Sequence, residues 1–243
     1  MTFEKDLYLG RQVVVVGGTS GIGLGIARAF AAHGARLLVT GAIAAEVDAA
    51  LVSENGFEGV AVDVRDAAAM RALFEARPVD VLVNCAGITR RDLAEHDPEV
   101  FAEVVDVNLV GMMRSCHAAR PALARSGGSI VNIASMLSFF GSAGVPAYAA
   151  SKGGVAQLTK SLAMAYAAEG VRVNALAPGY IATRLTNVLQ DDAARSGAIV
   201  ARTPMNRWGQ PEDVAQAALF LASPAASFIT GAIVPVDGGY LVA

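Results

Sequence analysis

The sequence predicts an α/β fold: a doubly wound, seven-stranded parallel sheet with helices on both faces. Seven short runs rich in β-branched residues recur along the chain, and longer alanine-rich helical stretches lie between them. This alternation is typical of parallel α/β folds. Several of the short runs are apolar at consecutive positions, as in strands buried on both faces. Neither a linker nor a charge run divides the chain, so residues 1–243 are expected to form a single domain.

These runs define the expected elements in order. The expected strands are Val13–Val16, Arg36–Thr40, Val60–Val62, Val79–Val83, Ser129–Ile133, Val171–Leu176 and Ala232–Val236. The clearest expected helices are Gly23–Ala32, Pro98–Leu123, Ala149–Glu169 and Pro211–Leu221. In such a sheet the ligand binds beyond the carboxyl ends of the strands, and the motifs described below fall at those ends.

The composition excludes several classes of protein. The 243 residues are 54% hydrophobic and 17% charged, which suits a chain that buries a substantial core. The net charge of −3 provides no basic surface, so neither nucleic acid nor an acidic membrane is an expected partner. Apolar stretches are interrupted well before the ~18 residues of a membrane span, and residues 1–6 do not resemble a signal peptide. We expect a cytoplasmic protein.

The two cysteines, Cys85 and Cys116, lie in apolar stretches without the spacing of a metal site or a redox pair. We interpret them as buried free thiols in a reducing compartment, and we expect no metal site.

A glycine-rich turn follows the first expected strand and leads directly into the first helix. It reads Gly17-Gly18-Thr19-Ser20-Gly21-Ile22-Gly23. Glycines permit a tight turn and a close approach of the backbone to a pyrophosphate, and the helix N-terminus supplies free N–H groups and partial positive charge. An ordinary glycine-rich turn could have the same composition, but this position between strand and helix indicates a dinucleotide site.

The sequence offers no clear selector between NAD and NADP. An acid at the end of the second strand would bind the ribose hydroxyls of NAD, whereas Arg or Lys would bind the 2′-phosphate of NADP. The strand ends instead at Gly41, residues 37–64 contain no Arg or Lys, and Ser20 precedes Gly21. A 2′-phosphate without a basic partner would lose more binding energy than ribose hydroxyls without an acidic partner, so we favour NAD over NADP. An aspartate placed at Gly41 should sharpen that preference.

A serine, a tyrosine and a lysine follow the fifth strand in an order suited to carbonyl chemistry. Ser135 ends that strand region, and Tyr148 and Lys152 share a helix face because they are four residues apart. Hydride transfer to a ketone leaves an alkoxide that must be protonated, and a phenol with an ordinary pKa of about 10 does this poorly. A nearby ammonium should lower the pKa of the phenol, and a serine hydroxyl can polarise the carbonyl. Each residue alone is usually a packing or capping residue, but together they predict an NAD(P)-dependent oxidoreductase.

With these motifs in this order, the chain resembles the short-chain dehydrogenase/reductase family of single-domain Rossmann enzymes, from Gly10 to Gly239. The resemblance implies the catalytic set Asn108, Ser135, Tyr148 and Lys152, in which Asn108 holds a water in a proton relay to Lys152. The turn and the resemblance together predict the cofactor-binding residues Gly17, Thr19, Ser20, Gly21, Ile22, Gly23, Gly41, Asp63, Val64, Asn84, Ala86, Gly87, Tyr148, Lys152, Pro178, Gly179, Ile181 and Thr183.

The chain departs from the family pattern near the adenosine end of the site. Val16 replaces a threonine common before the first glycine, and Cys85 replaces the second asparagine of an Asn-Asn-Ala-Gly motif. The segments 41–60 and 66–80 are shorter than is usual. The adenosine pocket is therefore the part of the resemblance that transfers least.

The substrate is expected to be a small molecule. The sequence is most similar in its motifs to 3-oxoacyl-carrier-protein reductases and to sugar or polyol dehydrogenases. The carrier-protein enzymes usually have arginines where Ser129 and Glu169 stand here, so we favour a small secondary alcohol or ketone, such as a polyol. The alternatives are an NADPH-dependent 3-oxoacyl-carrier-protein reductase and a nucleotide-binding regulatory protein without turnover.

Two further segments bear on the substrate. The run Met136–Phe140, with Tyr180, Leu185, Val188 and Leu189, either lines an apolar pocket or belongs to the core. The segment Thr183–Arg202 is expected to form a lid.

A homotetramer is expected, with a dimer as the alternative. The tyrosine helix should present Tyr148, Lys152, Val155 and Thr159 to the cofactor. Its other face carries small or uncharged residues at helical spacing, namely Ala150, Gly154, Gln157, Ser161, Ala165 and Ala168. The preceding long helix offers the apolar residues Val105, Leu109, Met112 and Met113, and symmetric pairing of such faces gives closed assemblies.

Overall fold

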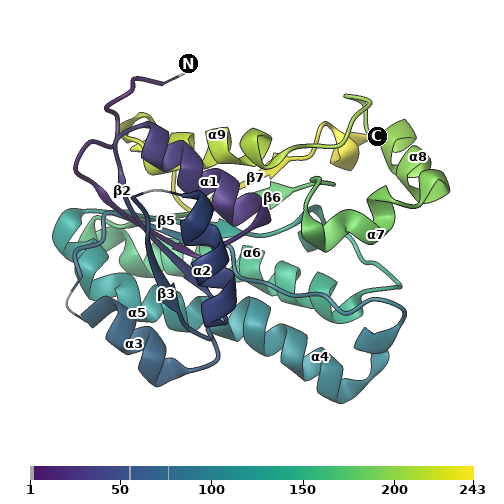
Figure 1. Ribbon diagram of the computed structural model, residues 1–243, viewed down its shortest axis with the longest axis horizontal. Coiled ribbons are helices and arrows are strands. Elements are labelled where there is room, and N and C mark those ends of the chain that lie inside the picture. Colours follow the sequence, from purple (N-terminus) through teal and green to yellow (C-terminus); the bar gives the residue numbers. More distant parts are fainter. Residues whose placement is uncertain (1–2, 55, 76) are drawn as a thin grey trace.

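The computed structural model describes residues 3–54, 56–75 and 77–243, which form one seven-stranded parallel sheet enclosed by helices (Figure 1). The strand order is β3-β2-β1-β4-β5-β6-β7. The strands are β1 (Gln12–Val16), β2 (Arg36–Gly41), β3 (Glu58–Ala61), β4 (Val81–Asn84), β5 (Ser129–Ile133), β6 (Arg172–Pro178) and β7 (Ile233–Val236). The predicted α/β class and the doubly wound parallel sheet are confirmed.

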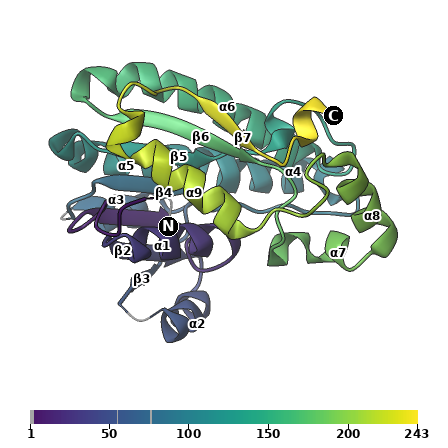
Figure 2. The same cartoon turned by 90° about the horizontal axis from the view of Figure 1, so that it is seen from above.

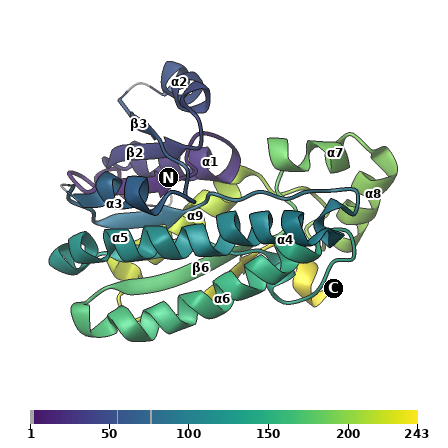
Figure 3. The ribbon, with the colours of Figure 1, turned by 90° about the horizontal axis from the view of Figure 1, so that it is seen from below.

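The helices form two layers. They are α1 (Gly21–Ala32), α2 (Ala44–Ser53), α3 (Ala67–Glu75), α4 (Pro98–Val105), α5 (Gly111–Ser126), α6 (Pro146–Tyr166), α7 (Asn187–Gln190), α8 (Ala193–Arg202) and α9 (Pro211–Ala222). Helices α1 and α9 cover one face of the sheet (Figure 2), and α3, α4, α5 and α6 cover the other (Figure 3). Helices α7 and α8 project beyond one end of the sheet, where the segment after β6 leaves it.

The consecutive apolar residues of β1 explain how one strand serves both layers. Val13 and Val15 pack in the cluster under α1 and α9, and Val14 and Val16 pack in the cluster under α3, α5 and α6. All four valines are at most 2% exposed. At ~25 cal/mol per Å² of buried apolar surface, a strand buried on both faces contributes about twice what a half-exposed strand would.

The strand order reverses between β1 and β4, and this reversal positions the site. The residue at the end of β1, Val16, pairs with Thr40 of β2 on one side and with Asn84 of β4 on the other. The connections from β1 and β4 then leave toward opposite layers, which opens a crevice beyond their carboxyl ends.

The predicted helix Pro98–Leu123 differs from the structure at its centre. The run is divided into α4, a π-helical turn at Asp106–Val110 and α5. A π turn inserts one extra residue per turn, and here it directs Asn108 inward, where the asparagine is completely buried.

The faces predicted for α6 also need correction. Val155 and Thr159 do not face the cleft: both are fully buried against the sheet, and Thr159 accepts a hydrogen bond from Asn132 Nδ2 at 3.0 Å. Met112, expected on an interface, is only 4% exposed because it packs in the core of the chain. None of the helices in the described part combines the length and apolarity needed to cross a bilayer.

Candidate active site

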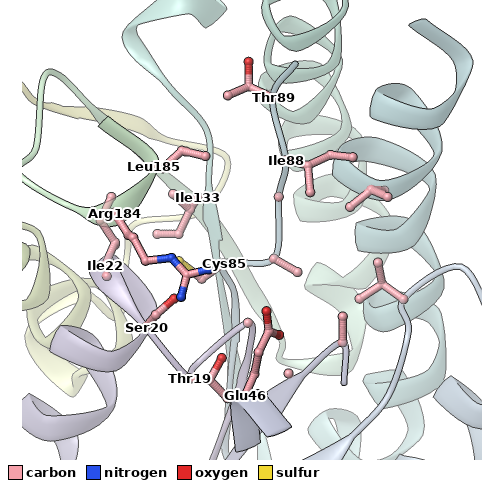
Figure 4. Close-up of a pocket in the computed structure, with 18 of the residues that line it drawn as sticks. Thr19, Ser20, Ile22, Glu46, Cys85, Ile88, Thr89, Ile133, Arg184 and Leu185 are labelled. Atoms are coloured by element: carbon pink, nitrogen blue, oxygen red, sulfur yellow. The ribbon is translucent and has the colours of Figure 1, made fainter. Parts of the chain in front are cut away.

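A cleft of about 730 Å³ lies at the carboxyl ends of β1, β2, β4 and β5, between the glycine-rich turn and α6 (Figure 4). Thirteen of the predicted site residues line it: Gly17, Thr19, Ser20, Gly21, Ile22, Gly41, Asp63, Val64, Ala86, Gly87, Tyr148, Lys152 and Thr183. Residues from six separate parts of the chain are therefore brought to one edge of the sheet, as the motif positions predicted.

The glycine-rich turn is closed to any larger residue at two positions. Gly17 has φ +79°, and a Cβ added to it would lie 2.5 Å from the Ala86 nitrogen. A Cβ on Gly23 would lie 2.1 Å from the Gly17 oxygen. The backbone of the turn thus packs directly on the loop after β4. The first turn of α1 carries no acidic side chain that would repel an anion. Free N–H groups at a helix start, reached across a glycine surface, fit the pyrophosphate of a dinucleotide.

The adenosine end of the cleft contains two acids and one arginine. Asp63 and Arg65 form a bidentate pair, with Arg65 Nη2 2.6 Å from Asp63 Oδ2, and this pair holds the pKa of the Asp63 carboxyl below its usual range. Glu46, in the first turn of α2, lines the cleft without such a partner among the described residues, and its carboxylate points into the space beside Thr19 (Figure 4). The end of the cleft that would receive a ribose therefore carries a free negative charge.

Tyr148 and Lys152 lie together at the other end of the cleft. Pro146 occupies the first turn of α6 and begins the helix, as proline does at this position. Lys152 Nζ lies 5.6 Å from the centroid of the Tyr148 ring and donates a hydrogen bond to the Ile133 carbonyl at 2.6 Å. Burial lowers the pKa of Lys152 to about 8, because the ammonium has lost most of its water.

The expected lowering of the Tyr148 pKa is not found in this structure. Burial is the largest influence and raises the pKa of the phenol to about 12, while a hydrogen bond with Ser135 lowers it in part. Lys152 directs its ammonium to the Ile133 carbonyl, and desolvation of the phenol exceeds the attraction that the sequence argument relied on.

Asn108 is buried beside the same space. Its Oδ1 accepts from the Ile88 N–H at 2.8 Å, and its Nδ2 donates to the Ile88 carbonyl at 2.9 Å. A Cβ placed on Gly87 would lie 3.2 Å from Asn108 Oδ1 and 3.7 Å from Lys152 Nζ, so both polar groups border the gap that glycine leaves.

Seven predicted residues do not line the cleft. Asn84 is buried and donates to Asn132 Oδ1 at 2.9 Å in the core. Gly179 packs on Asp237, where a Cβ would lie 2.7 Å from its Cα, and Ile181 is 3% exposed. Both, with Pro178 at the end of β6, direct the chain toward Thr183. The remaining three contact residues that line the cleft: Gly23 packs on Gly17, Asn108 lies beside Gly87, and Ser135 forms a hydrogen bond with Tyr148.

Glu95 was not predicted from the sequence. This carboxylate is fully buried and accepts three hydrogen bonds: from Thr89 Oγ1 at 2.9 Å, from the Arg90 N–H at 2.8 Å and from the Tyr148 N–H at 2.8 Å. It ties the loop after β4 to the first turn of α6. No motif marks it, since nothing in the sequence distinguishes it from a surface acid.

Arg91 was also missed. The two residues after it, Asp92 and Leu93, both have left-handed backbone, with φ values of 58° and 64°. Two successive non-glycine residues in that region are strained, and such strain concentrates at functional sites. The turn places Arg91 on the cleft wall, where its charge lowers the pKa of Tyr148 and its Nη2 donates to the Leu185 carbonyl at 3.1 Å.

Some of the apolar residues that follow β5 and β6 line the cleft, and others belong to the core. Met136 is core, at 4% exposure, and Leu185 lines the cleft. Tyr180 packs edge-to-face on Trp208 and Tyr240, with centroids 5.6 and 5.3 Å apart, while Phe140 stacks on Tyr240. Val188 is 62% exposed on α7.

The comparisons with known proteins agree with this geometry. A family model described as enoyl-(acyl carrier protein) reductase matches residues 16–241. The chain belongs to the short-chain dehydrogenase/reductase family. It is an oxidoreductase of the class that transfers a hydride between NAD(P) and a carbonyl or secondary alcohol.

Particular relatives act on sugar acids and polyols. The chain is 44% identical to 2-dehydro-3-deoxy-D-gluconate 5-dehydrogenase of Bacillus subtilis, over 96% of this chain and 95% of the relative. It is 47% identical to galactitol 2-dehydrogenase (L-tagatose-forming) of Cereibacter sphaeroides, over 96% of each. Among solved structures, a gluconate 5-dehydrogenase of Burkholderia cenocepacia in complex with NADP and tartrate has a TM-score of 0.90 at 36% identity, covering 98% of each chain.

The buried lysine predicts a pH dependence of stability. The folded-state pKa of Lys152 is about 8, below its ordinary value of 10.5. As pH rises through 8, Lys152 loses its proton in the folded protein but keeps it in the unfolded chain. The unfolded state then binds more protons, so the free energy of unfolding rises with pH. Between pH 7 and pH 9.5 this contribution amounts to about 1–2 kcal/mol. Urea unfolding of wild type and Lys152→Met at both pH values should differ by this amount, and an identical response of the two proteins would contradict it.

Proposed function

We propose that this enzyme interconverts a secondary hydroxyl and a ketone on a polyhydroxylated carboxylic acid, that is, a sugar acid. The observation that carries this proposal is Arg91. Its guanidinium lies on the cleft wall near Tyr148, on a strained turn, and pairs with no acid among residues 3–54, 56–75 and 77–243. Its neighbour Arg90, in contrast, is paired with Glu103 at 3.0 Å. A guanidinium beside Tyr148 that has no acidic partner and spends one donor on the Leu185 carbonyl keeps other donors for a carboxylate on the substrate.

The catalytic roles proposed for the predicted set follow from position. Tyr148 is the general acid in reduction and the general base in oxidation, and the Ser135 hydroxyl holds the carbonyl oxygen. Lys152, with Asn108 beside it, holds the nicotinamide ribose and exchanges protons with Tyr148. The bound nicotinamide cofactor supplies or accepts the hydride.

The cofactor contacts proposed here come from the cleft. The backbone at Gly17, Gly21 and Ile22, with the side chains of Thr19 and Ser20, would hold the pyrophosphate end. Gly41, Asp63 and Val64 would border the adenosine, and Ala86, Gly87 and Thr183 would border the nicotinamide half.

Replacing the phenol tests the central role. Tyr148→Phe removes the proton donor and leaves the ring packing intact, so kcat should fall by about 10²–10⁴-fold with the dissociation constant of NADH nearly unchanged. Stopped-flow or steady-state absorbance at 340 nm measures the first quantity, and NADH fluorescence measures the second. Retention of more than a tenth of wild-type kcat would remove Tyr148 from the reaction.

The substrate class is tested at Arg91 with Arg90 as the matched control. In Arg91→Met, kcat/KM for gluconate should fall about 10–100-fold, because a charge-assisted hydrogen bond is lost, whereas the value for the neutral polyol galactitol should change less than threefold. Arg90→Met should affect neither substrate strongly. If wild type prefers galactitol, or if the Arg91 variant loses both activities equally, the sugar-acid proposal is wrong and a neutral polyol becomes the better substrate.

The carrier-protein alternative finds no support at the two positions that bear on it. Ser129 is buried, and Glu169 forms an ion pair with Arg120, whose Nε lies 3.0 Å from Glu169 Oε2. Glu169 thereby places an acid where these enzymes usually carry an arginine, and it neutralises Arg120 of α5, so neither position attracts an acidic carrier.

We further propose a preference for NAD over NADP. The relatives weigh the other way, since the Burkholderia structure contains NADP. The support is the unpaired Glu46 at the adenosine end and the engagement of Arg65 by Asp63, which together would repel a 2′-phosphate. An aspartate at Gly41 would need Thr19 and Val47 to give way slightly, because its Cβ would lie 3.0 Å from Thr19 Cγ2 and 3.2 Å from Val47 Cγ2.

The cofactor preference is measured by comparing kcat/KM for NAD and NADP in wild type, Glu46→Gln and Arg65→Met. Glu46→Gln should raise the relative use of NADP about 3–10-fold, since it removes one nearby like charge at a partly exposed site. A tenfold advantage for NADP in wild type that disappears in Arg65→Met would contradict the preference and show that Arg65 leaves Asp63 to bind the phosphate.

For assembly and location we propose a cytoplasmic homotetramer, with a dimer as the alternative. The support is an exposed stripe on α6, in which Gln157, Ser161 and Ala165 are exposed and Met164 is 79% exposed; Ala168, in the turn after the helix, continues it. Gly154, which was predicted to belong to this stripe, packs against Leu109 within the chain, because a Cβ there would lie 2.6 Å from Leu109 Cδ2. Light scattering at micromolar concentration should give four times the chain mass of 24.9 kDa, or twice that mass for the dimer, and a monomer mass would refute the proposal.

A further inference from the structure

The segment that follows β6 rests on the glycine-rich turn. A Cβ added to Gly21 would lie 3.3 Å from Thr183 Cγ2, so the start of the lid already touches the turn that would hold a pyrophosphate. Thr186 Oγ1 donates to the Ile181 carbonyl at 2.7 Å, and Gln190 Nε2 donates to the Thr183 carbonyl at 3.1 Å. These bonds fix the backbone on both sides of Arg184, which opens the short 3₁₀ helix Arg184–Thr186.

Arg184 directs its side chain into the cleft. Figure 4 shows the guanidinium extending from the lid toward the glycine-rich turn, on the side where Ser20 lies. The residue is exposed, and its guanidinium carries five N–H donors. A long cation reaching across an open channel indicates that its partner is a ligand of that channel.

The charges of the cleft single out this arginine. Four arginines line the cleft: Arg65, Arg90, Arg91 and Arg184. Arg65 is paired with Asp63, Arg90 is paired with Glu103, and Arg91 donates to the Leu185 carbonyl. Arg184 makes neither an ion pair nor a side-chain hydrogen bond with any residue that the structure describes. Its guanidinium also extends toward Ser20 at the N-terminus of α1, where an anion is already favoured.

We propose that Arg184 is a cofactor-binding residue that grips the diphosphate of the dinucleotide from the lid side. The N-terminus of α1 then holds the diphosphate with backbone N–H groups on one side, and the guanidinium holds it with a planar pair of donors on the other. Because Arg184 belongs to the lid, the same contact couples cofactor binding to the order of α7 and α8. The proposal rests on the cofactor site alone and is independent of the sugar-acid substrate.

Binding of ADP-ribose tests the contact, because this probe carries the diphosphate but no nicotinamide. By calorimetry, Arg184→Met should weaken ADP-ribose binding about 10–100-fold relative to wild type, and Arg184→Lys should give an intermediate loss, since lysine keeps the charge without the planar fork. The weakening should shrink at high salt. Arg195→Met is the matched control. Arg195 lies in the same segment, Thr183–Arg202, is paired with Asp192 at 3.2 Å and does not line the cleft. The affinity of this variant for ADP-ribose should therefore stay within twofold of wild type.

A second readout follows the lid itself. ADP-ribose should slow amide hydrogen exchange in α7 and α8 of wild type and of Arg195→Met, and should do so much less in Arg184→Met. Unchanged ADP-ribose affinity in Arg184→Met would overturn the proposal. If the KM for gluconate rises in the same variant while ADP-ribose affinity is unchanged, Arg184 binds the substrate carboxylate instead. A wild type that fails to bind ADP-ribose would instead overturn the cofactor site itself.

Discussion

The site depends on the buried carboxylate of Glu95. A fully buried charge is costly unless it is well hydrogen-bonded, and Glu95 meets this requirement with three donors from two segments. Hydrogen bonds to a charged group contribute about 1.5–3 kcal/mol each. Because one donor is the Tyr148 N–H and another the Arg90 N–H, the catalytic helix and the loop that carries Arg91 cannot shift independently. The tyrosine and the arginine proposed to hold the substrate are thus kept in register by a residue that touches neither reaction partner.

The second constraint is desolvation at the base of the cleft. In water a phenol and an ammonium have similar pKa values, but here burial places the pKa of Lys152 at about 8 and that of Tyr148 at about 12. Burial therefore favours the neutral phenol and amine over the phenolate–ammonium pair. A site of this kind gains its acid–base function when a bound molecule brings polarity and charge to the same space, and Ser135 already lowers the pKa of the phenol in part.

The fold could be predicted from the sequence almost completely, whereas the charges of the site could not. Consecutive apolar residues such as Val13–Val16 report burial on both faces, and the glycine turn, Tyr148 and Lys152 carry their positions in their spacing. Glu46, Glu95, Arg91 and Arg184 have no such pattern, because their roles depend on which acid meets which arginine after folding. The π turn at Asp106–Val110 was hidden for a similar reason: one inserted residue does not disturb an apolar helical pattern enough to be seen.

The most direct measurement of the central claim uses NADH carrying deuterium at both C4 positions, with a keto derivative of gluconate as substrate. The account predicts that mass spectrometry will find one deuterium in the product, bonded to the carbon that bore the ketone, and that Tyr148→Phe will form this product far more slowly. A product without deuterium, or no product from any keto sugar acid or keto polyol with either nicotinamide cofactor, would contradict it.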